Sequence, residues 1–154
     1  MNGNELIRAM TGAFYLLMGD ERARGCFDLS QAGAMRSFTG LLLSLPILFF
    51  SSTAAWRLAM GNENFPLEIP FGPFITAEML GTIVYWAAFL FAMSRISRAL
   101  GLSGAYLPYV VTFNWGMLFT NLVFALPLIP FSLGLYAIGA RLQPFFWLAA
   151  AALI

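Results

Sequence analysis

The sequence predicts an all-α, polytopic helical membrane protein with three full spans, a partial or truncated fourth span and an N-terminal amphipathic helix at the membrane interface. Composition is the first reason, because 60% of the residues are hydrophobic and 10% are charged, whereas soluble domains carry about 25% charged residues. The second reason is three long apolar runs, since a hydrocarbon core of about 30 Å needs roughly 20 helical residues. We expect a single membrane domain over residues 1–154.

The first expected element is a helix over residues 3–18. Leu6, Met10 and Phe14 recur at helical spacing, and most polar side chains fall on the other side of this helix. The run is too short and too polar to cross a bilayer, so it fits a helix lying in the membrane interface. The alternative is a helix packed against the protein's own loops. Gly19 is expected to end the helix.

The spans follow a solvated charge run over residues 20–25 and a capping residue, Ser30 or Asp28, that starts the first long helix. The expected full spans are residues 37–58, 73–95 and 106–127. A partial span is expected over 142–154, where 13 residues of helix cover about 20 Å. We expect the sequence to be a fragment that ends inside this helix.

The arginines predict the orientation of the spans. Six of the eight lie before the first span or between the second and third, and the positive-inside rule then places the N-terminus in the cytoplasm. These six are Arg8, Arg22, Arg24, Arg36, Arg95 and Arg98. Every basic residue is Arg and none is Lys, which favours a GC-rich bacterial source. The expected location is the bacterial inner membrane.

Composition excludes several classes of chemistry. The chain has no histidine, the commonest general base near neutral pH and a usual ligand of zinc and haem. Its only cysteine, Cys26, has no histidine to activate it, so a buried or interfacial role is the better interpretation. We expect no catalytic residue, no cofactor-binding residue and no metal site. A net charge of +1 predicts no nucleic-acid partner. The expected partners are the lipid bilayer and other membrane proteins, or a second copy of the chain.

One polar group stands out within the spans. Glu78 is the only charged residue of the second span before Arg95, and Thr82 and Tyr85 follow it at helical spacing. Asn114 and Asn121 lie seven residues apart on the third span. Glu78 and Asn121 sit at similar expected depths on antiparallel spans, so we expect the two side chains to meet. These five residues are the candidate intramembrane polar cluster: Glu78, Thr82, Tyr85, Asn114 and Asn121.

Three interpretations of Glu78 remain open. It can be a hydrogen-bonded clamp between helices, part of a proton or cation pathway, or a side chain exposed near the outer headgroups. A transporter usually shows several such groups together with broken helices and an inverted repeat. This sequence has one acid and no intramembrane base, which favours the clamp.

In layout the chain resembles the Yip domain family of multi-span membrane proteins. The matching residues are Asp28-Leu29 ahead of the first span, and Gly101-Leu102-Ser103 with Tyr106 after the second. The likeness covers residues 28–154 as an arrangement of elements. It implies an integral membrane protein without catalytic residues; eukaryotic members of that family act as partners of membrane-trafficking GTPases.

The function predicted from these observations is a non-enzymatic integral membrane protein that acts as a scaffold or partner-binding component. The first alternative is a small transporter, or a transporter subunit, that uses Glu78. The second alternative is an accessory subunit of a larger membrane bioenergetic complex.

Overall fold

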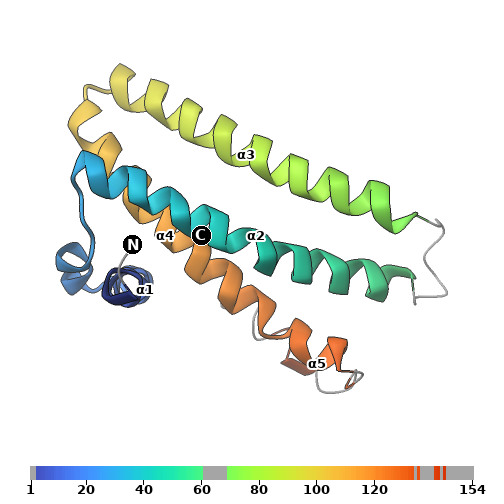
Figure 1. The fold of residues 1–154 in the computed structure, drawn as a ribbon. Helices are drawn as coiled ribbons and strands as arrows, with labels where there is room; N and C mark the ends of the chain where they lie inside the picture. The colour runs from blue at the N-terminus through green and yellow to red at the C-terminus, as the bar shows by residue number, and fades with distance from the viewer. Residues whose placement is uncertain (1–2, 61–68, 134, 136–140, 143, 145–154) are drawn as a thin grey trace. The chain divides into compact units, whose positions relative to one another are not determined.

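The three predicted full spans are present as three long apolar helices. The computed structural model describes residues 3–60, 69–133, 135, 141–142 and 144 (Figure 1). Its long helices are α2 (Gln31–Met60), α3 (Phe71–Ala99) and α4 (Ser103–Ala125). Each is long and apolar enough to cross a membrane, since even the 23 residues of α4 rise about 35 Å. No strand occurs in the described residues, and the chain has the helices of an integral membrane protein.

Three shorter elements accompany the long helices. Helix α1 is Gly3–Leu17, which agrees with the predicted bounds of 3–18. The charge run expected to be solvated has exposed charged side chains at Glu21, Arg22 and Arg24, and it forms a 3-10 helix, η1 (Glu21–Cys26), which the side chain of Asp20 caps. A short helix, α5 (Leu128–Ser132), was not predicted. The predicted partial span over 142–154 lies almost wholly outside the described residues.

The chain divides into two compact units, and each long helix contributes to both. The first unit is Met1–Ser44 with Ile83–Thr120, and the second is Leu45–Thr82 with Asn121–Ile154. In the first unit the buried side chains come from α1, η1 and the three long helices. Large buried apolar residues of this unit include Phe27, directly after η1, and Leu41, Trp86, Leu90, Val111, Trp115 and Leu118.

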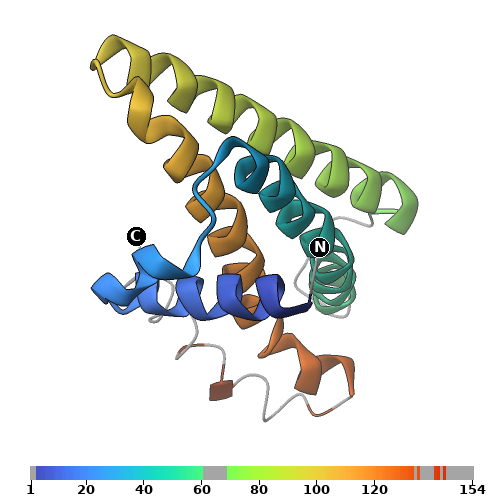
Figure 2. The ribbon, with the colours of Figure 1, turned by 60° about the vertical axis from the view of Figure 1, so that its left-hand side comes forward.

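Helix α1 packs on η1 through small residues. Ala9, Gly12 and Ala13 are its buried positions, and a Cβ atom on Gly12 would lie 2.6 Å from Cys26 Cβ. Bulky apolar residues on the other side of α1, including Ile7, remain exposed. Figure 1 shows α1 end-on where the start of α2 is seen from the side, and Figure 2 shows α1 along its length. Helix α1 therefore runs across the start of α2, and its position at a membrane interface stays a prediction.

Local side chains and glycines fix the ends of these helices. Ser30 Oγ accepts a hydrogen bond from Gly33 N at 3.1 Å, so the predicted N-cap of α2 is confirmed. A Cβ atom on Gly33 would lie 2.0 Å from Asp28 O, so only glycine fits beside this cap. Gly19 after α1 and Gly101 after α3 have φ of 65° and 71°, the left-handed conformation common after a helix.

In the second unit, aromatic side chains join the end of α2 to the start of α3. The Trp56 ring lies edge-on to the Phe71 ring at 5.2 Å between centroids. Trp56 Nε1 donates a hydrogen bond to Ile69 O at 2.8 Å. Phe49 also meets Phe71 edge-on, at 6.4 Å. An indole with one apolar face and one hydrogen-bonded edge suits a membrane–water interface.

Candidate functional site

The five residues of the predicted intramembrane cluster are divided between the two units: Glu78, Thr82 and Asn121 belong to the second, and Tyr85 and Asn114 to the first. Glu78 is exposed on α3, and within the described part of the chain it has no hydrogen bond or ion pair. Thr82 is half-buried and Tyr85 is exposed. Asn121 is buried, and its Nδ2 has no hydrogen-bond partner. The predicted contact between Glu78 and Asn121 is therefore not formed. Similar depth along two helices does not set the direction in which each side chain points.

Asn114 makes an interhelical hydrogen bond in the first unit, with a residue that the sequence analysis did not single out. Its Nδ2 donates to Ser37 Oγ on α2 at 2.8 Å. Ser37 Oγ in turn donates to Ala34 O at 2.7 Å. Both side chains are fully buried, and Asn114 Oδ1 has no partner. A polar contact of this kind holds two membrane helices in one register.

Small residues on α2 allow this close approach. Gly33 precedes Ser37 by four residues, and Gly40 precedes Ser44 by four, which is the small-xxx-small spacing of packed membrane helices. A Cβ atom on Gly40 would lie 3.1 Å from the backbone oxygen of Asn114. Ser44 Oγ donates a hydrogen bond to Gly40 O at 2.9 Å. The spacing was present in the sequence and was the signal that could have revealed this contact.

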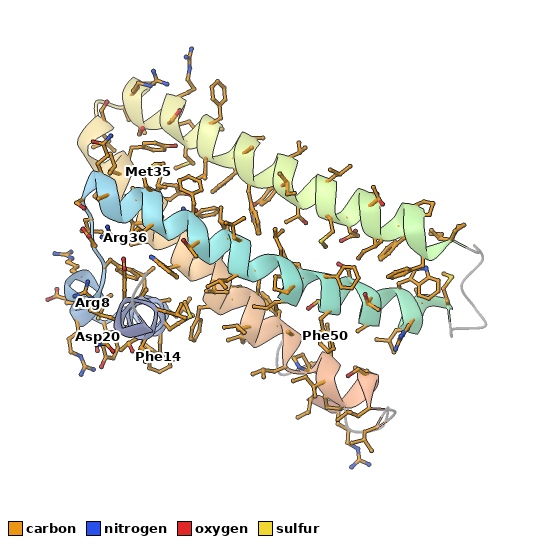
Figure 3. The ribbon with its side chains drawn as sticks, viewed as in Figure 1. Arg8, Phe14, Asp20, Met35, Arg36 and Phe50 are labelled. Carbon is orange, nitrogen blue, oxygen red and sulfur yellow. The ribbon has the colours of Figure 1, made fainter. Side chains whose placement is uncertain are left out.

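An ion-pair cluster of Arg36, Glu5 and Asp28 connects α1, the segment after η1 and the start of α2. Arg36 Nε donates to Glu5 Oε1 at 2.8 Å, and its Nη2 donates to Asp28 Oδ2. Figure 3 shows Arg36 near the start of α2, on the side of α1 and Arg8. Exposed ion pairs contribute little singly, but one guanidinium holding two acids from separate segments restricts all three segments together.

Hydrogen bonds lower the pKa of the two aspartates that flank η1, Asp20 and Asp28. Hydrogen bonds from the side chain and backbone N–H of Ser30 lower the pKa of Asp28 below its ordinary value, and the charges of Arg36 and Arg8 add to that effect. At the other end of η1, hydrogen bonds from Arg22 lower the pKa of Asp20. The Arg22 guanidinium also lies 4.4 Å from the centroid of the Tyr15 ring on α1, so η1 is fastened to α1 by charge as well as by packing.

Aromatic rings fill the contact between α3 and α4 in the first unit. Phe89 lies 5.0 Å from Phe113 and 5.8 Å from Tyr85, between centroids. Tyr109 stacks on Phe113 at 6.0 Å. Tyr106 Oη donates to Leu90 O at 2.9 Å. These geometries are those of packed aromatic side chains, and they place Tyr85 in a packing contact with Phe89.

The hydrogen bonds, ion pairs and aromatic contacts described above hold the helices of the first unit together. No group of His, Cys, Asp and Glu that could hold a metal ion occurs among the described residues. Cys26 donates a weak hydrogen bond to Arg22 O at 3.5 Å, and no histidine exists to activate it. Asn114, Tyr106 and Arg36 use their polar groups in contacts between helices or between a helix and a neighbouring segment. Comparison with family models, curated proteins and solved structures finds no match for this chain.

Proposed function

We propose that the chain is a non-enzymatic scaffold of the membrane that binds another membrane protein along α3. The observation that supports this proposal is the exposure of α3. Of the three apolar helices it is the least buried, and only Trp86 and Leu90 are buried along its 29 residues. A helix with one narrow buried face leaves most of its circumference to lipid or to a partner.

One exposed face of α3 has the character of a helix-packing seam. We call it the α3 seam, and its members are separated alternately by three and four residues, the spacing of knobs-into-holes packing. All of them are exposed: Glu78, Gly81, Tyr85, Ala88 and Ala92. Small side chains at such positions let a second helix approach closely in a membrane. An exposed carboxylate within an apolar helix is also costly without a partner.

A transport role through Glu78 has weaker support. In the described residues Glu78 forms no ion pair and no side-chain hydrogen bond, and a transport pathway uses several converging groups. One measurement distinguishes the transporter from the scaffold. A transporter of this kind would carry protons into vesicles that contain the purified protein, and that uptake would require Glu78. Wild-type uptake that Glu78→Gln abolishes would favour the transporter over the scaffold.

Site-specific photocrosslinking tests the scaffold. Ala87 and Ala88 are adjacent exposed alanines of α3, and in a helix of 3.6 residues per turn they point about 100° apart. A benzoylphenylalanine at position 88 faces the α3 seam, and one at position 87 is the matched control. We expect a discrete protein adduct in cell membranes from position 88 and none from position 87. Equal adducts at both positions, or none at either, would contradict a partner on this seam.

The proposed orientation places the N-terminus in the cytoplasm of a bacterial cell, on the basis of the arginine distribution. In a Cys26→Ala background, Asn62→Cys should react with an impermeant thiol reagent added to cells with a permeabilised outer membrane. Ser103→Cys should react only after the inner membrane is opened. The reverse pattern would mean that the N-terminus is outside.

A further inference from the structure

We infer that the cavity at the turn between α3 and α4 binds an acyl chain of an anionic phospholipid. The cavity has a volume of about 190 Å³ and lies wholly within the first unit. Its apolar lining comes from the last turns of α3, from the turn and from the first turns of α4. The lining residues that carry the argument are Met93, Ile96, Leu100, Leu102, Ala105 and Tyr109.

Three hydroxyl-bearing residues line this cavity, Ser97, Tyr106 and Tyr109, and the first two donate their hydroxyl hydrogens within the chain. Ser97 Oγ donates to Ser94 O at 3.2 Å, and Tyr106 Oη donates to Leu90 O at 2.9 Å. The accessible surface of the cavity is almost wholly carbon, so the cavity selects hydrocarbon over a polar ligand. An apolar cavity of about 150 Å³ in a protein stays dry and binds benzene. A cavity of about 190 Å³ therefore has room for a segment of an alkyl chain.

The position of the cavity identifies the source of the hydrocarbon. It opens between the ends of two helices that are long and apolar enough to cross a membrane. In a bilayer, lipid acyl chains surround such helices at high concentration. A phospholipid can therefore place one chain in the cavity while its headgroup stays at the interface.

Two arginines supply the charge that favours an anionic headgroup. Arg95 and Arg98 are exposed in the last turns of α3, and neither has a carboxylate partner among the described residues. Arg98 Nε donates to Ser94 O at 3.0 Å. Neither arginine lines the cavity, so their role is to attract and hold phosphate near its mouth. Guanidinium groups bind phosphate in a bidentate manner, and basic groups at the ends of membrane helices bind acidic lipids.

Lipid retention tests the inference. Wild-type protein would be extracted from vesicles of equal parts phosphatidylglycerol and phosphatidylcholine, and bound lipid counted by native mass spectrometry. We expect retained phosphatidylglycerol on the wild type and loss of that lipid from Ala105→Trp, because the indole fills the cavity. Ile96→Trp fills the cavity from the α3 side and is the second cavity-filling variant, used if Ala105→Trp does not fold. Ala99→Trp, on an exposed residue that does not line the cavity, is the control and should retain lipid.

Two results would overturn the inference. Retention by both cavity-filling variants at the wild-type level would mean that lipid binds elsewhere. Equal retention of the two lipids by the wild type, unchanged in Arg95→Gln, would overturn the anionic headgroup. The measurement does not depend on the α3 seam, so failure of the proposed scaffold role and failure of this site are distinguishable.

Discussion

Removing the Ser37 hydroxyl should destabilise the protein more than removing the whole Asn114 amide. The two fully buried side chains share one interhelical hydrogen bond of 2.8 Å. Ser37→Ala deletes the acceptor and leaves Asn114 Nδ2 unpaired beside Oδ1, which already lacks a partner. Asn114→Leu removes both buried polar atoms together, and Ser37 keeps its bond to Ala34 O. The asymmetry follows because an orphaned buried polar group costs more than a bond whose two partners are both absent.

The magnitudes follow from these atoms. Interhelical polar contacts in membranes contribute about 0.6 kcal/mol on average and up to about 1.7 kcal/mol. An orphaned buried donor costs about 1–3 kcal/mol. We therefore expect Ser37→Ala to lower the free energy of unfolding by about 1–2 kcal/mol. Asn114→Leu loses the same bond but also removes the buried Oδ1 that lacks a partner. Its net effect on the free energy of unfolding should therefore stay within about 1 kcal/mol of zero. The double variant should match Asn114→Leu, because the hydroxyl then has no partner on α4.

The assay is unfolding by sodium dodecyl sulfate in mixed micelles, followed by tryptophan fluorescence. Ser94→Ala is the matched control, because Ser94 Oγ donates only within α3, to Phe91 O at 2.7 Å. Its effect should stay within about 0.5 kcal/mol. Asn114→Ala separates polarity from overpacking by Leu. A Ser37→Ala effect no larger than that of Ser94→Ala would refute the reasoning, and so would a double variant whose effect is the sum of the two single effects.

Three further changes test the contacts around the ends of the helices. Arg36→Gln should release α1 from the start of α2, and amide hydrogen exchange of α1 should quicken while that of α4 stays unchanged. Trp56→Phe keeps an aromatic ring beside Phe71 but loses the 2.8 Å bond to Ile69 O, so the free energy of unfolding should fall by about 0.5–1.5 kcal/mol. Acidification should weaken the contact of Asp28: its pKa is lowered in the folded protein, so its contribution is present above the ordinary pKa of 3.8 and is lost as the pH falls through the folded value.

Each of these three has its own control. Arg24→Gln removes an exposed guanidinium that has no carboxylate partner in the described residues, and α1 exchange should not change. For Trp56, the exchange rate of the Phe71–Phe74 amides should rise together with the stability loss; a loss without that local change would place the effect elsewhere. Asp28→Asn should flatten the fall in unfolding free energy between pH 6 and pH 3. An unaltered pH profile would show that Asp28 is not the group responsible.

The helices could be predicted because span length and hydropathy are properties of a single segment. The runs over 73–95 and 106–127 were recognised from their lack of charge, and α3 and α4 cover nearly the same residues. Ser30 as the cap of α2 was likewise a local prediction, since the hydroxyl and the N–H that it accepts from are three residues apart. The charge run at η1 was harder, because its structure depends on α1, against which Ala23 is buried.

The candidate site could not be predicted to the same degree because it depends on which faces of the helices meet. Asn114 was singled out correctly as a polar residue of a span, but it was grouped with Asn121 by their seven-residue spacing, and only Asn121 was paired with Glu78 by depth. Its partner, Ser37, lies 77 residues earlier in the chain. Arg36 was counted only as an orientation signal, whereas it joins two acids from separate segments. The glycine and serine residues that lie four apart on α2 would have indicated the face of α2 that packs against Asn114.

The contrast between Asn114 and Glu78 also bears on what the protein does. Helix α4 buries Asn114 against the small residues of α2, so that polar group is used within the chain. Helix α3 leaves its glutamate exposed seven residues after Phe71, which is about 10 Å from the start of the helix. A glutamate side chain is too short to carry its carboxylate that far to an interface as Arg or Lys would, so lipid alone solvates it poorly. The small residues that follow Glu78 on the α3 seam admit a second helix close enough to supply a donor. Glu78 and the seam thus favour the same occupant, a membrane protein whose helix carries a hydrogen-bond donor at the depth of Glu78.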